Sequence, residues 1–313
     1  MVSDMRVTVI GAGGVGGYFG GRLVQAGVDV TFLARGAHLE ALQRDGLSVR
    51  SIRGGFTVPV KATEDVGSIG SADFVLVTVK SYDSGRVAEM LPTLIGGHGA
   101  VVSLQNGVDN EDRFAAVVGE DRVVGGAAYI FATIAEPGII EHTGGPASVV
   151  VGEWGGGTSE RVAALVDRFR AAGVDTEESS DIRAVLWAKF AFICAQAGVT
   201  AAVRLPIGEI RSQPAGRELF RALATDVCAV AAAEGVDLPV DLPARTLGIA
   251  DALDPNSFSS LHHDLVHGNR LELDALLGEV IRRGERRGVD VPTTKAVYGV
   301  LAPWAARAAP THQ

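Results

Sequence analysis

The hydrophobic positions in the first half of the chain follow a strand-and-helix rhythm. Short apolar runs rich in β-branched residues alternate with longer stretches of helical spacing, which is typical of parallel βαβ units. The predicted strands cover residues 7–10, 28–33, 74–79, 101–104 and 123–129. Residues 47–60, with Gly54 and Gly55 at their centre, indicate a hairpin-like excursion, and residues 139–151 a further β segment. We therefore expect an N-terminal α/β domain with a doubly wound, Rossmann-type sheet.

The second half has a different pattern. After about Ser179, long Ala- and Leu-rich helical stretches replace the strands. Prolines lie near the expected helix boundaries, at Pro206, Pro214, Pro239, Pro243, Pro255 and Pro292. A chain of 313 residues, 47% of them hydrophobic, has enough apolar material for two packed cores. We predict an α/β domain over residues 1–178 and an all-α C-terminal domain over residues 179–313.

The charge balance argues against some partners. With 28 basic and 37 acidic residues, the formal net charge is -9, which disfavours binding to nucleic acid or to an anionic membrane surface. Residues 1–6 lead directly into the first apolar run without the features of a signal peptide. The most apolar later stretch, residues 184–203, is interrupted by Lys189, Gln196 and Gly198, so it falls short of the roughly 20 apolar residues of a membrane span. We expect a cytoplasmic protein.

A glycine-rich turn follows the first predicted strand. It consists of Gly11, Ala12, Gly13, Gly14, Val15 and Gly16, and a helix-compatible stretch and a second strand come after it. This is the context that the dinucleotide-binding fingerprint requires, whereas the alternative is a plain turn. Gly11 would permit the tight turn, Gly13 would let the backbone approach a pyrophosphate, and Gly16 would let the helix pack on the sheet. We predict a cofactor site at Gly11, Gly13, Gly14, Val15 and Gly16.

The end of the second strand predicts which cofactor binds. An NAD site usually has an acidic residue there to accept hydrogen bonds from the ribose, but residues 31–35 contain none and end in Arg35. A guanidinium suits the adenosine 2'-phosphate through charge-assisted bonds. The sequence therefore favours NADPH over NADH, although an arginine here could also be an ordinary surface residue.

Polar residues follow two more strands. Lys80 comes at the end of the third predicted strand, and Asn106 directly after the fourth. Ligands bind at the carboxyl ends of parallel strands, so we expect both residues to contact cofactor or substrate. The alternative is that each is simply a polar residue where the chain leaves a strand.

Lys189 is the one charged residue between Ala184 and Ala195, in a stretch that predicts a buried helix. Burial penalises the ammonium form, so we expect a lowered pKa and easier proton donation near neutral pH. A lysine whose stem packs while its head reaches water is the alternative. Glu272, at the expected start of another helix, is a candidate partner, or else an acid favoured there by the helix dipole.

Cysteines and histidines do not predict a metal or redox site. Cys194 and Cys228 are isolated within helical patterns, so we expect reduced, packed thiols. His263 and His267, beside His262, are one helical turn apart, as two metal ligands would be. No third ligand is evident in the sequence, so we expect no metal.

The chain resembles the ketopantoate reductases along almost its whole length. The matching segments are residues 11–16, Val79 with Lys80, residues 105–107, Trp187 with Lys189, and residues 259–272. The last two segments are the most specific. Lys189 is followed at the family's spacing by Thr200 and residues 206–209, and the serine pair Ser259 and Ser260 is followed by Glu272.

This resemblance implies a function and roles for individual residues. The family reduces ketopantoate, a 2-oxo acid of pantothenate biosynthesis, with NADPH in a Rossmann domain joined to a helical substrate and catalytic domain. Lys189 would be the general acid, and Glu272 would orient it or the product hydroxyl. Asn106 and Ser260 would hold the substrate, while Lys80 would contact cofactor and substrate. Hydride would pass to the ketone carbon while the ammonium stabilises the growing alkoxide.

Three departures from the family pattern concern the substrate. Ile193, Ala197 and Ile207 stand where the family usually has asparagines. A buried hydrogen bond lost in this way is worth about 1 to 3 kcal/mol when its partner stays unpaired, so ketopantoate itself would be a poor substrate. We expect Ile193 and Ala197 to contact a 2-oxo acid with a less polar or bulkier side chain.

Other functions fit parts of the pattern. A β-hydroxyacid dehydrogenase also joins a dinucleotide domain to a helical domain with a lysine, but the block at residues 259–272 argues against it. Imine reduction is a further enzymatic option, and a non-catalytic NADPH sensor is an option outside catalysis. Retention of both Lys189 and Glu272 argues against a sensor. The helical half would supply a homodimer interface, as in many relatives, but no exposed apolar face marks one in the sequence.

Overall fold

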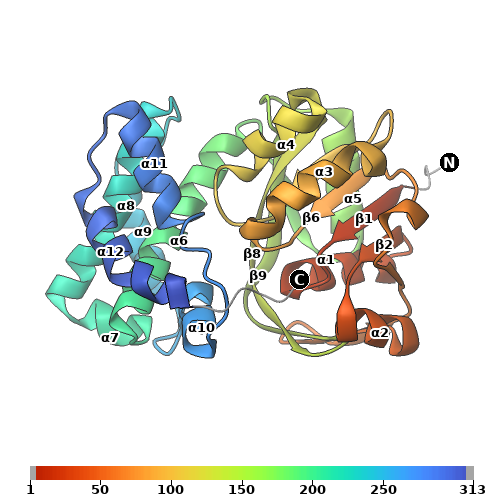
Figure 1. The fold of residues 1–313 in the computed structure, drawn as a ribbon, viewed down its shortest axis with the longest axis horizontal. Coiled ribbons are helices and arrows are strands. Elements are labelled where there is room, and N and C mark those ends of the chain that lie inside the picture. Colours follow the sequence, from red (N-terminus) through yellow and green to blue (C-terminus); the bar gives the residue numbers. More distant parts are fainter. Residues whose placement is uncertain (1–4, 308–313) are drawn as a thin grey trace. The chain divides into compact units, whose positions relative to one another are not determined.

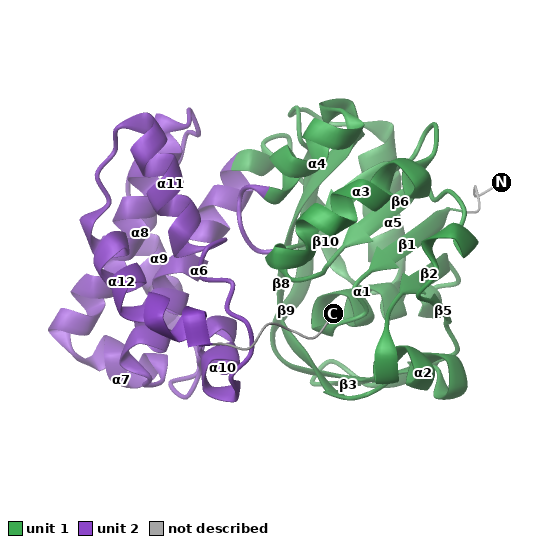
Figure 2. Cartoon of the chain, in the orientation of Figure 1, with its two compact units in different colours: residues 1–105, 110–183 green, residues 106–109, 184–313 purple. Residues whose placement is uncertain are grey.

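The computed structural model describes residues 5–307. Residues 1–4, part of the stretch in which we expect no signal peptide, and residues 308–313 lie outside the described residues. The chain divides into two compact units (Figure 2): Met1–Gln105 with Asn110–Arg183, and Asn106–Asp109 with Ala184–Gln313. The short segment Asn106–Asp109 thus belongs to the second unit. The domain division at residues 178–179 stays a prediction.

One mixed sheet forms the basis of the first unit (Figure 1). Ten strands of the described residues lie in the order β4-β3-β9-β8-β7-β6-β1-β2-β5, with β10 beside β9. Their bounds are β1 Arg6–Ile10, β2 Asp29–Leu33, β3 Leu47–Ser51, β4 Phe56–Val58, β5 Lys61–Thr63, β6 Phe74–Val77, β7 Ala100–Ser103, β8 Val123–Glu136, β9 Ile139–Glu153 and β10 Asp175–Glu178. Strands β5, β2, β1, β6, β7 and β8 are parallel neighbours. Because β1 lies between β2 and β6, its carboxyl end is a topological switch point, where sheets of this kind bind ligands.

Helices cover both faces of this sheet, as in a doubly wound fold. They are α1 Gly14–Gln25, α2 Gly36–Asp45, α3 Ser84–Ile95, α4 Asn110–Val118 and α5 Glu160–Ala171, with short 3-10 helices η1 Val66–Ser68, η2 Ser81–Asp83 and η3 Glu120–Arg122. Helix α1 packs with α5, and α3 packs with α4 on the other face. Phe19 of α1 and Phe169 of α5 meet edge to face with their ring centroids 6.3 Å apart, which anchors α1 to the core.

The hairpin predicted over residues 47–60 is confirmed, because β3 and β4 are antiparallel with Leu47 opposite Val58. The predicted strand at residues 123–129 is too short. Strand β8 continues to Glu136 and pairs with the antiparallel β9 along its length. The turn between them contains Gly138 at φ +79°, a left-handed conformation that glycine adopts without strain.

The second unit is helical, as predicted. Its helices are α6 Ile182–Val203, which starts at the end of the first unit, α7 Ile207–Ser212, α8 Pro214–Ala233, α9 Leu242–Ala252, α10 Ser260–His267, α11 Leu277–Arg287 and α12 Pro292–Arg307. Pro206 precedes α7, while Pro214 and Pro292 open α8 and α12. Proline fits the start of a helix because the first backbone N–H groups have no partner within the helix.

Helix α6 is a core helix. By length and composition it meets the criteria for a membrane span, contrary to our expectation from the sequence. However, 67% of its most apolar window is buried within the protein. Phe190, Ala191 and Cys194 of α6 belong to the hydrophobic core of the second unit, which gives its apolar composition a structural reason.

Candidate functional site

The glycine-rich turn lies at the switch point of the sheet, after β1. Gly11 has φ +97°, and a Cβ atom at this position would lie 2.8 Å from Val79 Cγ1. Its N–H donates to Leu33 O at 3.2 Å. Both the left-handed backbone and the close approach of the β6 end therefore require glycine here.

The later glycines bring backbones together at the start of α1. A Cβ atom on Gly16 would overlap Gly11 O and lie 2.9 Å from Val9 Cγ1, so its absence lets α1 pack on β1. A Cβ atom on Gly14 would overlap the carbonyl of Ala132. Gly14 thus admits the backbone of β8, a contact that sequence reasoning missed because the two segments are far apart in the chain.

The amino end of α1 is open. Gly13 is its N-cap, and no atom of another segment lies within 4 Å of the place where a Cβ atom would stand. No acidic residue lies in the first turn, and no side chain caps it. Unpaired N–H groups and the helix dipole at such an end favour an anion. The residues present therefore fit the pyrophosphate of a dinucleotide, and Val15 lies half-buried in the same turn.

Thr78, just after β6, ties the ends of β1 and β6 together. Its Oγ1 donates to Gly11 O at 2.6 Å, and its N–H donates to Ile10 O at 3.0 Å. Lys80 follows two residues later, half-buried, as the N-cap of η2. The structure thus places Lys80 at the carboxyl edge of the sheet, just after the end of β6, the strand beside β1.

Gln105 connects the segment before Lys80 to the segment before Asn106. Its Nε2 donates to Val79 O at 2.8 Å and to Ser84 Oγ at 2.9 Å. The Ser84 hydroxyl in turn donates to Asn110 Oδ1 at 2.9 Å. These buried bonds fix the backbone on both sides of the residues at the ends of β6 and β7. Asn106, directly after Gln105, is half-buried and belongs to the second unit.

Arg35 lies at the end of β2 as the N-cap of α2. Its side chain is 62% exposed, and Nη2 lies 3.7 Å from Asp83 Oδ2. An exposed ion pair at this distance contributes little to stability. Arg35 therefore sits at the carboxyl edge of the sheet with its guanidinium accessible and a carboxylate nearby.

His38 is a residue that sequence reasoning missed. Its Nε2 lies 2.8 Å from Ala12 O, and Gly138 N donates to its Nδ1 at 3.0 Å. The neutral imidazole thus links the glycine turn to the β8–β9 turn, since Nε2 donates while Nδ1 accepts. Burial lowers the pKa of His38, opposed by the bond to Ala12 O. Its place three residues after Arg35 was visible in the sequence, but its bond to a residue 100 positions away was not.

In the second unit, Lys189 lies on α6 and is half-buried, next to the buried Trp187. Ile193 and Ala197 follow at intervals of four residues and share its helix face. Ile193 is half-buried, whereas Ala197 is only 2% exposed. Ile207, at the start of α7, is 1% exposed and is part of the core.

The serine pair lies at the amino end of α10. Ser259 is the N-cap, and its Oγ accepts from His262 N at 3.1 Å and lies 2.7 Å from Thr200 Oγ1 of α6. Ser259 therefore fixes α10 to α6, while Ser260 is the exposed first residue of α10. The pair thus divides into a structural serine and an accessible one.

The prediction that Glu272 begins a helix is wrong. Helix α11 begins only at Leu277, and the segment before it is a turn in which Glu272 O accepts from Leu276 N at 3.1 Å. Glu272 is half-buried in this turn. The acid in the first turn of α11 is Glu279, so the helix dipole does not explain Glu272.

The predicted site residues thus form two groups. The glycine turn, Arg35 and Lys80 lie in the first unit, and the second unit contains the others: Asn106, Lys189, Ile193, Ala197, Ser260 and Glu272.

Burial raises the pKa of the Cys194 thiol, and that of Cys228 to about 11. Both cysteines are free, as predicted, and are poor nucleophiles. The described residues contain no group of three metal-ligating side chains.

Comparison with known proteins points to one family. The family models "Ketopantoate reductase PanE/ApbA" and "Ketopantoate reductase PanE/ApbA C terminal" match residues 7–156 and 181–304. The uncharacterized oxidoreductase YkpB of Bacillus subtilis is 32% identical over 297 residues, 95% of this chain and 98% of that protein. The 2-dehydropantoate 2-reductase of Archaeoglobus fulgidus is 32% identical over 296 residues, 95% of this chain and 96% of that protein. A ketopantoate reductase structure from Ralstonia eutropha has a TM-score of 0.88 at 34% identity, and the match covers 96% of this chain and 99% of that one.

Proposed function

The chain belongs to the ketopantoate reductase family, and we propose that it uses NADPH to reduce a 2-oxo acid to a 2-hydroxy acid in the cytoplasm. The observation that carries this proposal is Lys189, half-buried on the core helix α6, in a chain whose other unit has an open glycine turn at a switch point. The resemblance to the ketopantoate reductases, on which we base the residue roles, includes both the glycine turn and the segment that contains Lys189. A dehydrogenase of this kind needs a dinucleotide site and a proton donor.

The bound cofactor would supply a hydride from nicotinamide C4. The chain's own residues would do the rest. In the forward reaction Lys189 donates a proton from its ammonium group to the oxygen of the ketone as the carbon gains hydride, so the product is a neutral hydroxyl. Glu272 orients Lys189 or that hydroxyl. Asn106 and Ser260 hold the substrate, and Lys80 contacts cofactor and substrate.

NADPH is proposed as the donor because of Arg35. A phosphate with two negative charges competes well for a guanidinium whose present partner, Asp83, is 3.7 Å away in an exposed pair. No acidic residue occurs between Thr31 and Arg35 to receive the ribose hydroxyls of NADH. Cofactor selection would then depend on a single accessible side chain.

The proposed substrate has a less polar side chain than ketopantoate. Of the three residues that replace family asparagines, only Ile193 keeps appreciable exposure, because Ala197 and Ile207 are 2% and 1% exposed. Ile193 follows Lys189 by one helical turn. We therefore assign substrate discrimination mainly to Ile193. The small side chain of Ala197, one helical turn further along α6, would leave space beside it. The helical part, residues 179–313, would be the substrate domain and the site of a homodimer interface.

A substrate panel tests this function. Purified protein is mixed with NADPH or NADH and with 2-oxo acids from ketopantoate through branched to aromatic ones, and the 2-hydroxy acid product is identified. We expect NADPH oxidation that is fastest with a branched or aromatic acid. Equal or better turnover of ketopantoate would refute the substrate assignment, and tight NADPH binding without turnover of any acid would favour the sensor.

A further inference from the structure

An arginine of α11 binds the segment Asn106–Asp109, which belongs to the same unit. Arg283 of α11 donates from Nη2 to Val108 O at 3.1 Å, across 175 positions of the chain. Val108 is 2% exposed, and Gly107 before it has φ +111°. The path of the chain just after Asn106 is therefore defined by a left-handed glycine and a buried charge-assisted bond.

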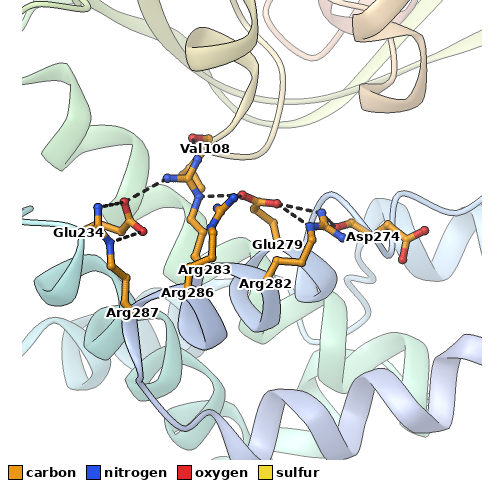
Figure 3. A network of polar contacts seen from close by, with 8 residues as sticks. All are labelled: Val108, Glu234, Asp274, Glu279, Arg282, Arg283, Arg286 and Arg287. Carbon is orange, nitrogen blue, oxygen red and sulfur yellow. Dashed lines mark hydrogen bonds and ion pairs between the residues drawn. The ribbon is translucent and has the colours of Figure 1, made fainter.

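Each nitrogen of the Arg283 guanidinium has a different partner (Figure 3). Nε donates to Glu279 Oε1 at 2.7 Å, and Nη1 lies 3.4 Å from Glu234 Oε2. The side chain is only 10% exposed, and its guanidinium carbon lies 5.7 Å from the centroid of the Trp187 ring. A planar fork can serve three directions at once, which a lysine ammonium on a flexible stem cannot do with the same geometry.

Neighbouring arginines fix the two carboxylates. Glu279 also accepts from Arg282 Nε at 3.0 Å, and Glu234 accepts from Arg287 at 3.1 and 3.2 Å. The hydrogen bond from Arg287 lowers the pKa of Glu234, opposed by burial and helped by the charge of Arg283. The carboxylates are thus held in place on both sides of Arg283, and the buried charge is compensated.

This network lies next to three residues of the proposed site. Val108 comes two positions after Asn106, and Trp187 two positions before Lys189. Arg282 Nη2 donates to Asp274 O at 2.6 Å, two positions after Glu272. None of the network side chains is itself a proposed catalytic or substrate-binding group. The network therefore contacts the supports of the site rather than its reacting groups.

We propose that Arg283 is a positioning residue, which sets Asn106 for the substrate by holding the Val108 carbonyl. This inference rests on the proposed function, in which Asn106 binds the 2-oxo acid. Glu279 and Glu234 act through Arg283 by fixing the direction of its guanidinium. Loss of the Val108 bond would free the segment and lower the population of molecules with Asn106 in place.

The test compares Arg283→Lys with Arg287→Lys. Both substitutions keep the charge and lie on α11 beside Glu234, but only Arg283 contacts Val108. Arg283→Lys should lower kcat/KM for the best 2-oxo acid about 30-fold, whereas Arg287→Lys should stay within about twofold of the wild type. NADPH affinity should stay within about twofold in both. Equal losses in the two variants would refute the proposal.

A double-mutant cycle separates positioning from general stability. If Arg283 acts through Asn106, its substitution should matter little once Asn106 has been removed. Adding Arg283→Lys to Asn106→Ala should therefore lower kcat/KM by less than about twofold. A full multiplicative loss in the double variant would contradict the proposal. Should Arg283→Lys fail to fold, Glu234→Gln, which keeps the shape of the side chain, should give a smaller loss with the same non-additivity, and an additive loss would again refute it.

A readout without substrate keeps this inference distinct from the proposed function. Hydrogen exchange of the amides at residues 106–109 should accelerate roughly tenfold or more in Arg283→Lys and stay unchanged in Arg287→Lys. Unchanged exchange would overturn the role of Arg283 whatever the substrate. Accelerated exchange in a protein that turns over no 2-oxo acid would support the role of Arg283 in holding residues 106–109 and would refute the proposed function.

Discussion

In the proposed function, the 2'-phosphate of NADPH replaces Asp83 as the partner of the Arg35 side chain. Its ion pair with Asp83 is exposed and 3.7 Å long, so replacing it requires little free energy. Arg35→Ala should raise the Kd for NADPH about 10- to 100-fold and leave that for NADH within about twofold. Fluorescence titration with both cofactors measures the change. Asp83→Asn, which removes the competitor, should tighten NADPH binding, and an unchanged cofactor preference in Arg35→Ala would rule out the phosphate role.

We predict that acid weakens the contacts of the glycine turn through His38. Its folded-state pKa lies below 6.5 because of burial, so its contribution to the free energy of unfolding is complete above pH 6.5. The contribution is lost as the pH falls through the folded pKa, since a protonated Nδ1 can no longer accept from Gly138 N. His38→Gln keeps a donor and an acceptor but does not titrate.

Urea unfolding of both proteins at about pH 8 and about pH 5 checks this account. The wild type should lose more stability than His38→Gln over this range, and NADPH binding at the lower pH should weaken more in the wild type. His142 and His262 also have lowered pKa values because of burial, and both are present in either protein. An identical pH dependence of the two proteins would exclude His38 as the sensitive group.

At the scale of elements, we propose that Ile193, one helical turn after Lys189 on α6, determines which 2-oxo acid is accepted. Ile193→Asn restores the amide that the family usually carries, and it should raise kcat/KM for ketopantoate relative to a branched 2-oxo acid about tenfold or more. Steady-state rates with the two acids measure the ratio. Ala197→Asn is the matched comparison, and because Ala197 is 2% exposed, it should instead lower stability by about 1 to 3 kcal/mol. A ratio unchanged by Ile193→Asn would mean that this residue does not contact the substrate.

Elements with a clear hydrophobic period were predictable from the sequence. The strands at the switch point and the helical second half follow from spacing alone, because period and burial agree there. The outer part of β8 is different. Residues 130–136 are a strand because they pair with β9, and that partner is known only from the fold. Glu272 was misplaced in a helix because residues 270–274 mix apolar and charged positions as a first helical turn does, whereas the chain makes a separate turn before α11.

At the scale of the whole molecule, the sequence located residues but not the links between them. The bonds from Arg283 to Val108 and from His38 to Gly138 join segments 175 and 100 positions apart. No local pattern reports such pairs, because tertiary packing alone brings them together. The glycine turn was predictable since its fingerprint is contiguous, and the candidate acid Lys189 was predictable since one charge in an apolar helix stands out.

The central step of the proposed chemistry is the proton transfer from Lys189. The most direct test measures NADPH oxidation by the best 2-oxo acid in the wild type and in Lys189→Ala, together with the Kd for NADPH. Loss of a general acid should lower kcat/KM about 100- to 10,000-fold with NADPH binding unchanged. Full activity in Lys189→Ala would contradict the assignment of Lys189 as the general acid. A wild-type protein that fails to oxidise NADPH with every 2-oxo acid tested would contradict the proposed function itself.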